Sequence, residues 1–138
     1  VAIGLDQNRL TMLLAVLHRH GGLHTGDQDV FVNVVGGVRV SETGADLAML
    51  LAIVSSLRDR ALDQNLVVFG EVGLSGEIRP VPSGQERIRE AAKHGFKRAI
   101  VPIANAPKAN APNAKSDDGV GGMEIIGVRT LQEALEAL

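Results

Sequence analysis

The sequence has no cysteine, tryptophan or tyrosine, and only three phenylalanines among its 138 residues. Without cysteine, the chain can form no disulfide, no thiolate nucleophile and no cysteine-based zinc site. With so few aromatic side chains, it is also a poor candidate for the stacking platforms that bind single-stranded nucleic acid. The core must therefore be built from leucine, valine, isoleucine and alanine.

Long apolar runs and a strong net charge are missing as well. No apolar run approaches the roughly 18 residues that a membrane-spanning helix needs, and the first residues lack the pattern of a signal peptide. We therefore expect a cytoplasmic protein with no membrane partner. The net charge of −2 argues against a protein that coats nucleic acid, although a local basic patch remains compatible with it.

What is present fits one globular domain over residues 1–138, because 45% of the residues are hydrophobic. The abrupt start at Val1 suggests a fragment of a larger protein. Four leucines between residues 10 and 17 form one stripe of a helix over Asn8–His20, which the pair Gly21-Gly22 ends. A second helix, Gly44–Arg58, is apolar nearly all round, which predicts that it is buried at the centre.

Capping patterns mark the starts of several helices. Thr43 precedes Asp46 as in a capping box, Ser83 caps a helix that reaches His94, and Thr130 caps a last helix. Residues 104–122 have almost nothing to bury, so we expect a flexible loop there. Runs of β-branched residues predict strands at 29–35, 38–40, 66–69, 78–81, 99–101 and 123–128. The fold class is therefore α/β (α+β), a mixed sheet packed with helices, whose strand order the sequence leaves open.

The stretch Gly70–Val81 resembles the signature G-E-(I/V)-x-L-x-G-x-(I/V)-x-P-(I/V) of Lon-type proteolytic domains, and the likeness continues through Lys93–Pro102. With the strand at 30–35 and the buried helix, it covers most of residues 28–138. The resemblance implies the Lon proteolytic-domain fold, also described as ribosomal protein S5 domain 2-like.

Three further runs, Leu5–Leu10, Ala15–Leu23 and Asn33–Val40, resemble the C-terminal domain of the bacterial RadA (Sms) DNA-repair family. That family implies a hexameric ring, contact with DNA, and a link to the recombinase RecA. Its complete members carry a zinc motif and an ATP-driven, DnaB-like motor ahead of this domain. The sequence has neither a phosphate-binding G-x-x-x-x-G-K-[ST] pattern nor a cysteine cluster. ATP, Mg and Zn are therefore expected only in parts that precede this chain.

The resemblance also implies that this domain is catalytically inactive. Lon proteases use a serine–lysine dyad, and their motifs place Gly44 at the serine position and Gln85 at the lysine position. Glycine offers no nucleophile, and a glutamine amide cannot act as a base. A full-length member would be a DNA-dependent ATPase or helicase. The rival enzyme hypothesis is a serine peptidase with a displaced pair, Ser41 or Ser83 with Lys93.

Two basic clusters are candidates for contacts to DNA phosphates. No acidic residue occurs between Gln7 and Gly26, and a second cluster lies in the helix that follows Ser83. The alternative is an ordinary solvated surface, on which Glu86 and Glu90 neutralise their neighbours. The candidate DNA-binding residues are Arg9, His18, Arg19, Arg87, Arg89 and Lys93.

Other charged groups favour no site. His20 and His24 have helical spacing, but the glycines between them should break the helix, so we expect no metal site. Arg58 and Arg60 lie at a helix C-terminus, where the helix dipole favours positive charge without any function. An oligomerisation scaffold with no DNA contact remains an open alternative.

Overall fold

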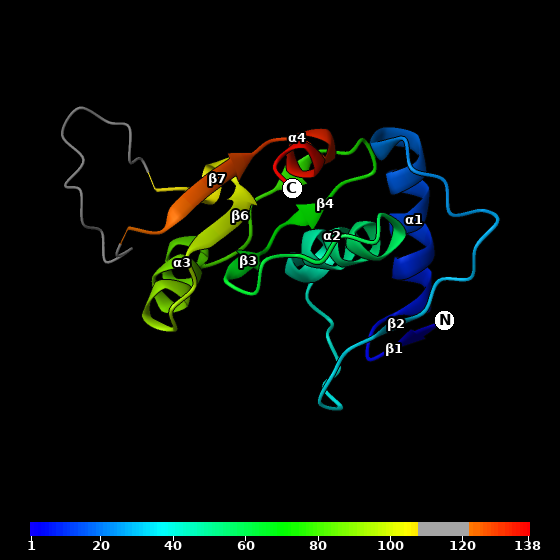
Figure 1. Cartoon of the computed structure of the whole chain (residues 1–138), viewed down its shortest axis with the longest axis horizontal. Coiled ribbons are helices and arrows are strands. Elements are labelled where there is room, and N and C mark those ends of the chain that lie inside the picture. Colours follow the sequence, from blue (N-terminus) through cyan, green and yellow to red (C-terminus); the bar gives the residue numbers. More distant parts are fainter. Residues whose placement is uncertain (108–121) are drawn as a thin grey trace.

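The computed structural model describes residues 1–107 and 122–138, and it confirms the expected mixed α/β class (Figure 1). None of the helices in these two ranges is both long enough and apolar enough to cross a membrane. The elements in chain order are β1 (Ala2–Ile3), α1 (Gln7–Gly21), β2 (Val32–Asn33), the 3-10 turn η1 (Thr43–Ala45), α2 (Asp46–Leu57), β3 (Leu66–Val68), β4 (Glu71–Val72), β5 (Ile78–Arg79), α3 (Gly84–Lys93), β6 (Arg98–Pro102), the 3-10 turn η2 (Ile103–Asn105), β7 (Glu124–Val128) and α4 (Leu131–Glu136).

The strands form three small sheets. Strands β3, β6 and β7 lie parallel in that order, with Leu66 opposite Arg98 and Arg98 opposite Glu124. Strands β4 and β5 form an antiparallel hairpin, and β1 pairs with β2 in parallel. Parallel strands bury both faces, which is why β6 reads as the almost continuous apolar run Ala99–Val101.

Two hydrophobic clusters hold these layers together. The larger one joins α1, α2 and α4, and its fully buried side chains include Leu13, Leu50 and Leu131. The smaller one lies under α3 and contains Ile88, Phe69 and Val101. The predicted buried helix is confirmed as α2, because most of its apolar side chains belong to the larger cluster.

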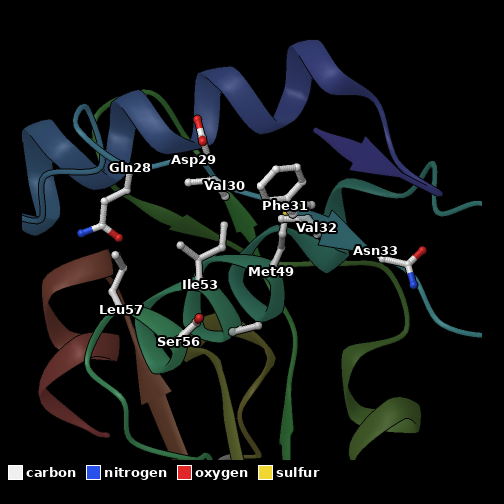
Figure 2. Close-up of a pocket in the computed structure, with 11 residues that line it drawn as sticks. Gln28, Asp29, Val30, Phe31, Val32, Asn33, Met49, Ile53, Ser56 and Leu57 are labelled. Atoms are coloured by element: carbon white, nitrogen blue, oxygen red, sulfur yellow. The ribbon is translucent and has the colours of Figure 1, made fainter.

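The predicted strands at 29–35 and 38–40 are mostly wrong. Only Val32 and Asn33 pair, with β1, and residues 38–40 form no strand. The segment 28–33 instead runs along α2, and a groove of about 300 Å³ separates the two (Figure 2). Because this segment does not join the three-stranded sheet, Phe31 and Val35 remain 73% and 85% exposed.

One of the three predicted caps is confirmed. The Thr130 hydroxyl accepts a hydrogen bond from the Glu133 amide at the start of α4. The Thr43 prediction is wrong, because this hydroxyl donates to the Glu71 carboxylate at 2.6 Å. The Ser83 prediction is wrong as well, because Ser83 adopts a left-handed conformation (φ +58°) and its side chain makes no capping bond.

The predicted flexible loop over residues 104–122 is wrong at its start. Ala104 and Asn105 belong to η2, and the Asn105 side chain pairs with Val81. Its oxygen accepts from the Val81 amide at 2.8 Å, and its nitrogen donates to the Val81 carbonyl at 3.1 Å. The pair fixes the turn after β6 against the segment that leads into α3. Residues 108–121 of the predicted loop lie outside the described residues.

Candidate functional site

Gly44, the expected serine position, is buried in η1 and lines a cleft of about 310 Å³. A Cβ added at Gly44 would lie 3.1 Å from Cγ1 of Val81, a tight contact, and 3.9 Å from Nη1 of Arg87. The glycine therefore lets the start of α2 pack closely against the segment that leads into α3. The residues that line the cleft are Ser41, Glu42, Thr43, Gly44, Glu71, Pro80, Val81, Pro82 and Arg87.

Gln85, the expected lysine position, is exposed on the first turn of α3 and does not line this cleft. The cation that lines it is Arg87, and a guanidinium remains protonated and cannot serve as a base. The rival pair is not brought together either. Ser41 lines the cleft, whereas Lys93 is exposed at the far end of α3.

Arg87 is held by three contacts. Its Nε donates to the Pro82 carbonyl at 3.1 Å, and its Nη2 lies 3.4 Å from the Glu42 carboxylate. Its guanidinium also lies over the Phe69 ring, 5.9 Å from the centroid. Among the three cations of α3 that the sequence suggested as DNA ligands, Arg87 is thus the one that binds other residues of the chain.

Arg9 is committed to a buried carboxylate. Its Nε donates to Oδ1 of Asp46 at 3.1 Å, its Nη2 bonds Oδ2, and the Val72 amide donates to the same Oδ2 at 3.1 Å. The Asp46 side chain is 2% exposed and that of Arg9 is 28% exposed. This network joins α1, α2 and β4, so the first predicted phosphate ligand has a structural partner.

The hydrogen bonds that Arg9 donates to the Asp46 carboxylate raise the pKa of Arg9 above its ordinary value, and burial opposes this rise only in part. A raised pKa on a cation contributes stability that is fully present below the unfolded pKa. It is lost only as the pH rises through the folded pKa. For an arginine both values lie above the range in which proteins work, so the pair remains intact at ordinary pH.

The remaining predicted residues of α1 lie in its last turn. His18 and Arg19 are exposed there, where cations complement the negative end of the helix dipole. The His18 ring meets the His24 ring edge-on at 4.2 Å between centroids. His20 shares a hydrogen bond of 3.1 Å with the Leu74 carbonyl of the β4–β5 turn. Gly22, in a left-handed conformation, ends the helix as predicted.

On α3, Arg89 and Lys93 are both exposed, one helical turn apart. The neutralising alternative would need Glu86 or Glu90 in an ion pair with them. Over residues 1–107 and 122–138, no carboxylate lies within 4 Å of either cation. Arg89 and Lys93 are therefore two exposed positive charges on α3 that no carboxylate of the described residues neutralises by direct contact.

The two basic helices are not neighbours. In Figure 1, α1 lies at one end of the long axis and α3 at the other, with α2 and the β4–β5 hairpin between them. The structure thus brings Gly44 and Arg87 together but leaves Arg19 and Arg89 on separate surfaces. In the described part of the chain, no group of three or more histidine, aspartate or glutamate side chains is placed to hold a metal ion.

Sequence reasoning missed the carboxylate that decides the role of Arg9. Asp46 was interpreted only as part of a helix cap, although it stands alone at the head of the apolar run Leu47–Val54. A carboxylate at the edge of so apolar a helix needs a cationic or hydrogen-bonding partner once buried. This requirement could have indicated from the sequence that Asp46 has a charged partner elsewhere in the chain.

The domain resembles known proteins over most of its length. The family model described as "Subunit ChlI of Mg-chelatase" matches residues 7–105. The chain is similar to proteins named DNA repair protein RadA: 73% identical in Escherichia coli, over 98% of this chain and 27% of the relative, and 46% in Aquifex aeolicus, over 98% and 28%. The relative from Bacillus subtilis is 42% identical over the same shares, 98% and 28%. The chain thus spans little more than a quarter of these curated relatives.

Proposed function

The chain belongs to the family described as subunit ChlI of Mg-chelatase, and because it is also similar to DNA repair proteins named RadA, we propose that it serves a RadA-type DNA repair protein as a binding and assembly module. The observation that carries the DNA contact is the exposed, unneutralised pair Arg89 and Lys93 on α3. Cations one turn apart on a helix can reach successive phosphates without reading sequence. Arg19 and His18 supply a second, smaller contact at the end of α1.

Arg9 and Arg87 take a different part in this proposal. Both are tied to carboxylates of the domain itself, so they shape the surface rather than bind the ligand. Replacing either would weaken DNA binding only through a change of fold. The DNA ligands proposed here are therefore fewer than the six residues that the sequence suggested.

The module is not a peptidase in this proposal. Gly44 supplies no nucleophile to the cleft, and the lining of that cleft has an arginine but no lysine among the described residues. The hydroxyls of Ser41 and Thr43 also line the cleft, but among the described residues no lysine lies there to take the proton as the Lon dyad requires. A Lon-like domain of this kind keeps the packing of a protease without the proton transfer that activates serine.

Assembly is the second part of the proposal, and exposed apolar side chains support it. Phe31, Val35 and Val38 are all more than half exposed, at 73%, 85% and 57%, on the segment that follows α1. Val35 and Val38 line the same pocket as Ile3, which is 60% exposed, and exposed apolar side chains that gather in one place mark interaction sites. A second copy of the chain, in a ring, is the partner proposed for them. The ATP-driven motor with its Mg and Zn, the RecA link and a cytoplasmic location are proposed for the complete protein.

The test is a salt titration of a fluorescent duplex binding to the purified chain, with the mass in solution measured alongside. Arg89→Glu/Lys93→Glu should weaken binding strongly and reduce the slope of log affinity against log salt by about two, one for each lost phosphate contact. Arg19→Glu should act less. The control is Arg129→Glu, an exposed arginine outside both helices.

Two results would overturn parts of the proposal. Equal losses of duplex affinity in the α3 variant and in Arg129→Glu would contradict the assignment of the DNA contact to α3. No binding at low salt together with a multimeric mass would leave a scaffold without DNA contact.

A further inference from the structure

A basic cleft of about 220 Å³ lies where α2 ends, apart from the cleft at Gly44. Three arginines line it: Arg58 at the end of α2, Arg60 in the next turn, and Arg98 on β6. Val54 and Leu66 contribute apolar surface to it. Neither the DNA-binding proposal nor the resemblance assigns a role to this place.

The turn after α2 brings two of these arginines to one cleft. Asp59, between them, has a left-handed backbone (φ +53°), a conformation that aspartate tolerates better than most residues. The turn is closed by two bonds between the same residues: the Ser55 hydroxyl donates to the Arg60 carbonyl at 2.6 Å, and the Arg60 amide donates to the Ser55 carbonyl at 3.1 Å. This hydrogen-bonded turn therefore fixes the backbone that carries Arg58 and Arg60 at the cleft.

The carboxylates around the cleft pair directly with one of its three arginines, Arg98, and leave the other two without an ion pair. Asp63 lines it, and its Oδ1 accepts from the Asn65 amide at 2.8 Å. Arg98 pairs with Glu124 at 3.3 Å and donates to the Ala137 carbonyl at 3.3 Å. In the parts of the chain that the structure describes, Arg58 and Arg60 have no carboxylate within 4 Å. Leu138 also lines the cleft, and its terminal carboxylate forms no ion pair with any described arginine.

The helix dipole alone accounts for only part of this arrangement. The C-terminus of α2 carries about half a negative charge, which one arginine already balances. Because Arg98 is paired with Glu124, one arginine in this concave place exceeds what the dipole and the ion pair require. Guanidinium groups bind phosphate through two parallel N–H donors, and the apolar floor limits the screening by water.

We propose that the cleft at Arg58, Arg60 and Arg98 binds a phosphate group. The three guanidinium groups donate to its oxygens, and Arg98, held by Glu124 and Ala137, is the fixed member. The phosphate belongs either to a small free molecule or to the DNA backbone, whose chemistry is the same. The proposal goes beyond the α3 surface, because none of its residues lies on α1 or α3.

The test is a titration of the full chain with pyrophosphate, followed by NMR signals of the arginine Nε–Hε groups and of the amides of residues 55–66. Saturable shifts should occur at these groups. The variant Arg58→Gln/Arg60→Gln should weaken binding by about tenfold or more, since it removes two charge-assisted contacts. The control Arg39→Gln/Arg129→Gln removes the same charge at two exposed arginines outside both proposed phosphate surfaces and should leave the affinity unchanged. No saturable shift, or equal losses in the two variants, would overturn the proposal.

Two further measurements keep the result interpretable. Thermal melting of each variant checks that it folds, and Arg58→Lys/Arg60→Lys keeps the charge but removes the paired donors, so it should bind with intermediate affinity. Affinity equal to that of the glutamine variant would still support the arginine geometry, whereas full affinity would contradict it. Displacement of pyrophosphate by duplex identifies the DNA backbone as the source, and simultaneous binding identifies a free phosphate. The Arg89→Glu/Lys93→Glu variant tests the α3 surface separately, so the two proposals can fail independently.

Discussion

Helices α1 and α3 have similar basic sequences but use their arginines differently. α1 buries Leu10, Leu13, Val16 and Leu17 in the larger cluster and directs Arg9 to the buried Asp46. α3 buries only Gly84, Ile88 and Ala91 and leaves Arg89 and Lys93 in solvent. The difference shows that the spacing of cations along a helix does not reveal their role. The position of a buried carboxylate decides it.

The largest expected effect is on stability, at Arg9. Arg9→Ala should lower the free energy of unfolding by about 3 kcal/mol, because it leaves the Asp46 carboxylate buried without its cation. This is the lower end of the range for breaking a buried pair, since Arg9 keeps 28% of its side chain exposed. Arg89→Ala on α3 should change it by less than about 0.5 kcal/mol. Denaturant unfolding measures both.

A double-mutant cycle of Arg9→Ala with Asp46→Ala tests the cause. The two losses should overlap by about 1–3 kcal/mol, because removing the carboxylate also removes the need for its partner. If the losses were simply additive, the Arg9–Asp46 pair would not be what distinguishes α1 from α3.

A smaller effect is expected where η1 meets the segment before α3. Gly44→Ser should lower the free energy of unfolding by about 1–2 kcal/mol, because its Cβ would lie 3.1 Å from Val81 and the packing must shift. Gln85→Lys, exposed on α3, should leave the melting curve unchanged. The combined variant should remain folded and cleave no unfolded protein, because position 85 does not line the cleft. Cleavage would contradict the separation of the two positions.

The smallest effects concern the two helix starts. Asp6 caps α1 by accepting from the Asn8 amide at 2.9 Å, so Asp6→Ala should cost about 1 kcal/mol. Ser83 makes no such bond and holds a left-handed backbone, so Ser83→Gly should raise the free energy of unfolding by about 1 kcal/mol. Melting temperatures of the two variants should therefore move in opposite directions. A loss of stability in Ser83→Gly would indicate that Ser83 has a contact that the structure does not show.

The helices were predictable from local patterns, and the candidate site was not. Leucine spacing located α1, and the apolar run located α2, because a buried helical face shows directly in the sequence. The cap at Thr130 was local as well. The cap predicted at Thr43 is wrong because its hydroxyl donates to a distant partner, Glu71, and the cap predicted at Ser83 is wrong because this residue has a left-handed backbone and makes no capping bond. Strand 29–35 failed because strand pairing depends on where α2 lies.

The sequence by itself determined the mixed α/β class, the predominantly aliphatic core and the absence of a serine at position 44 and of a lysine at position 85. These properties depend on residue type and on neighbours within a few positions. Only the tertiary structure decided that Arg9 binds Asp46, that Arg87 turns toward Glu42, and that Arg58 and Arg60 share a cleft with Arg98. A charged side chain goes where burial leaves an opposite charge or an open surface, and both are created by segments far apart in the chain.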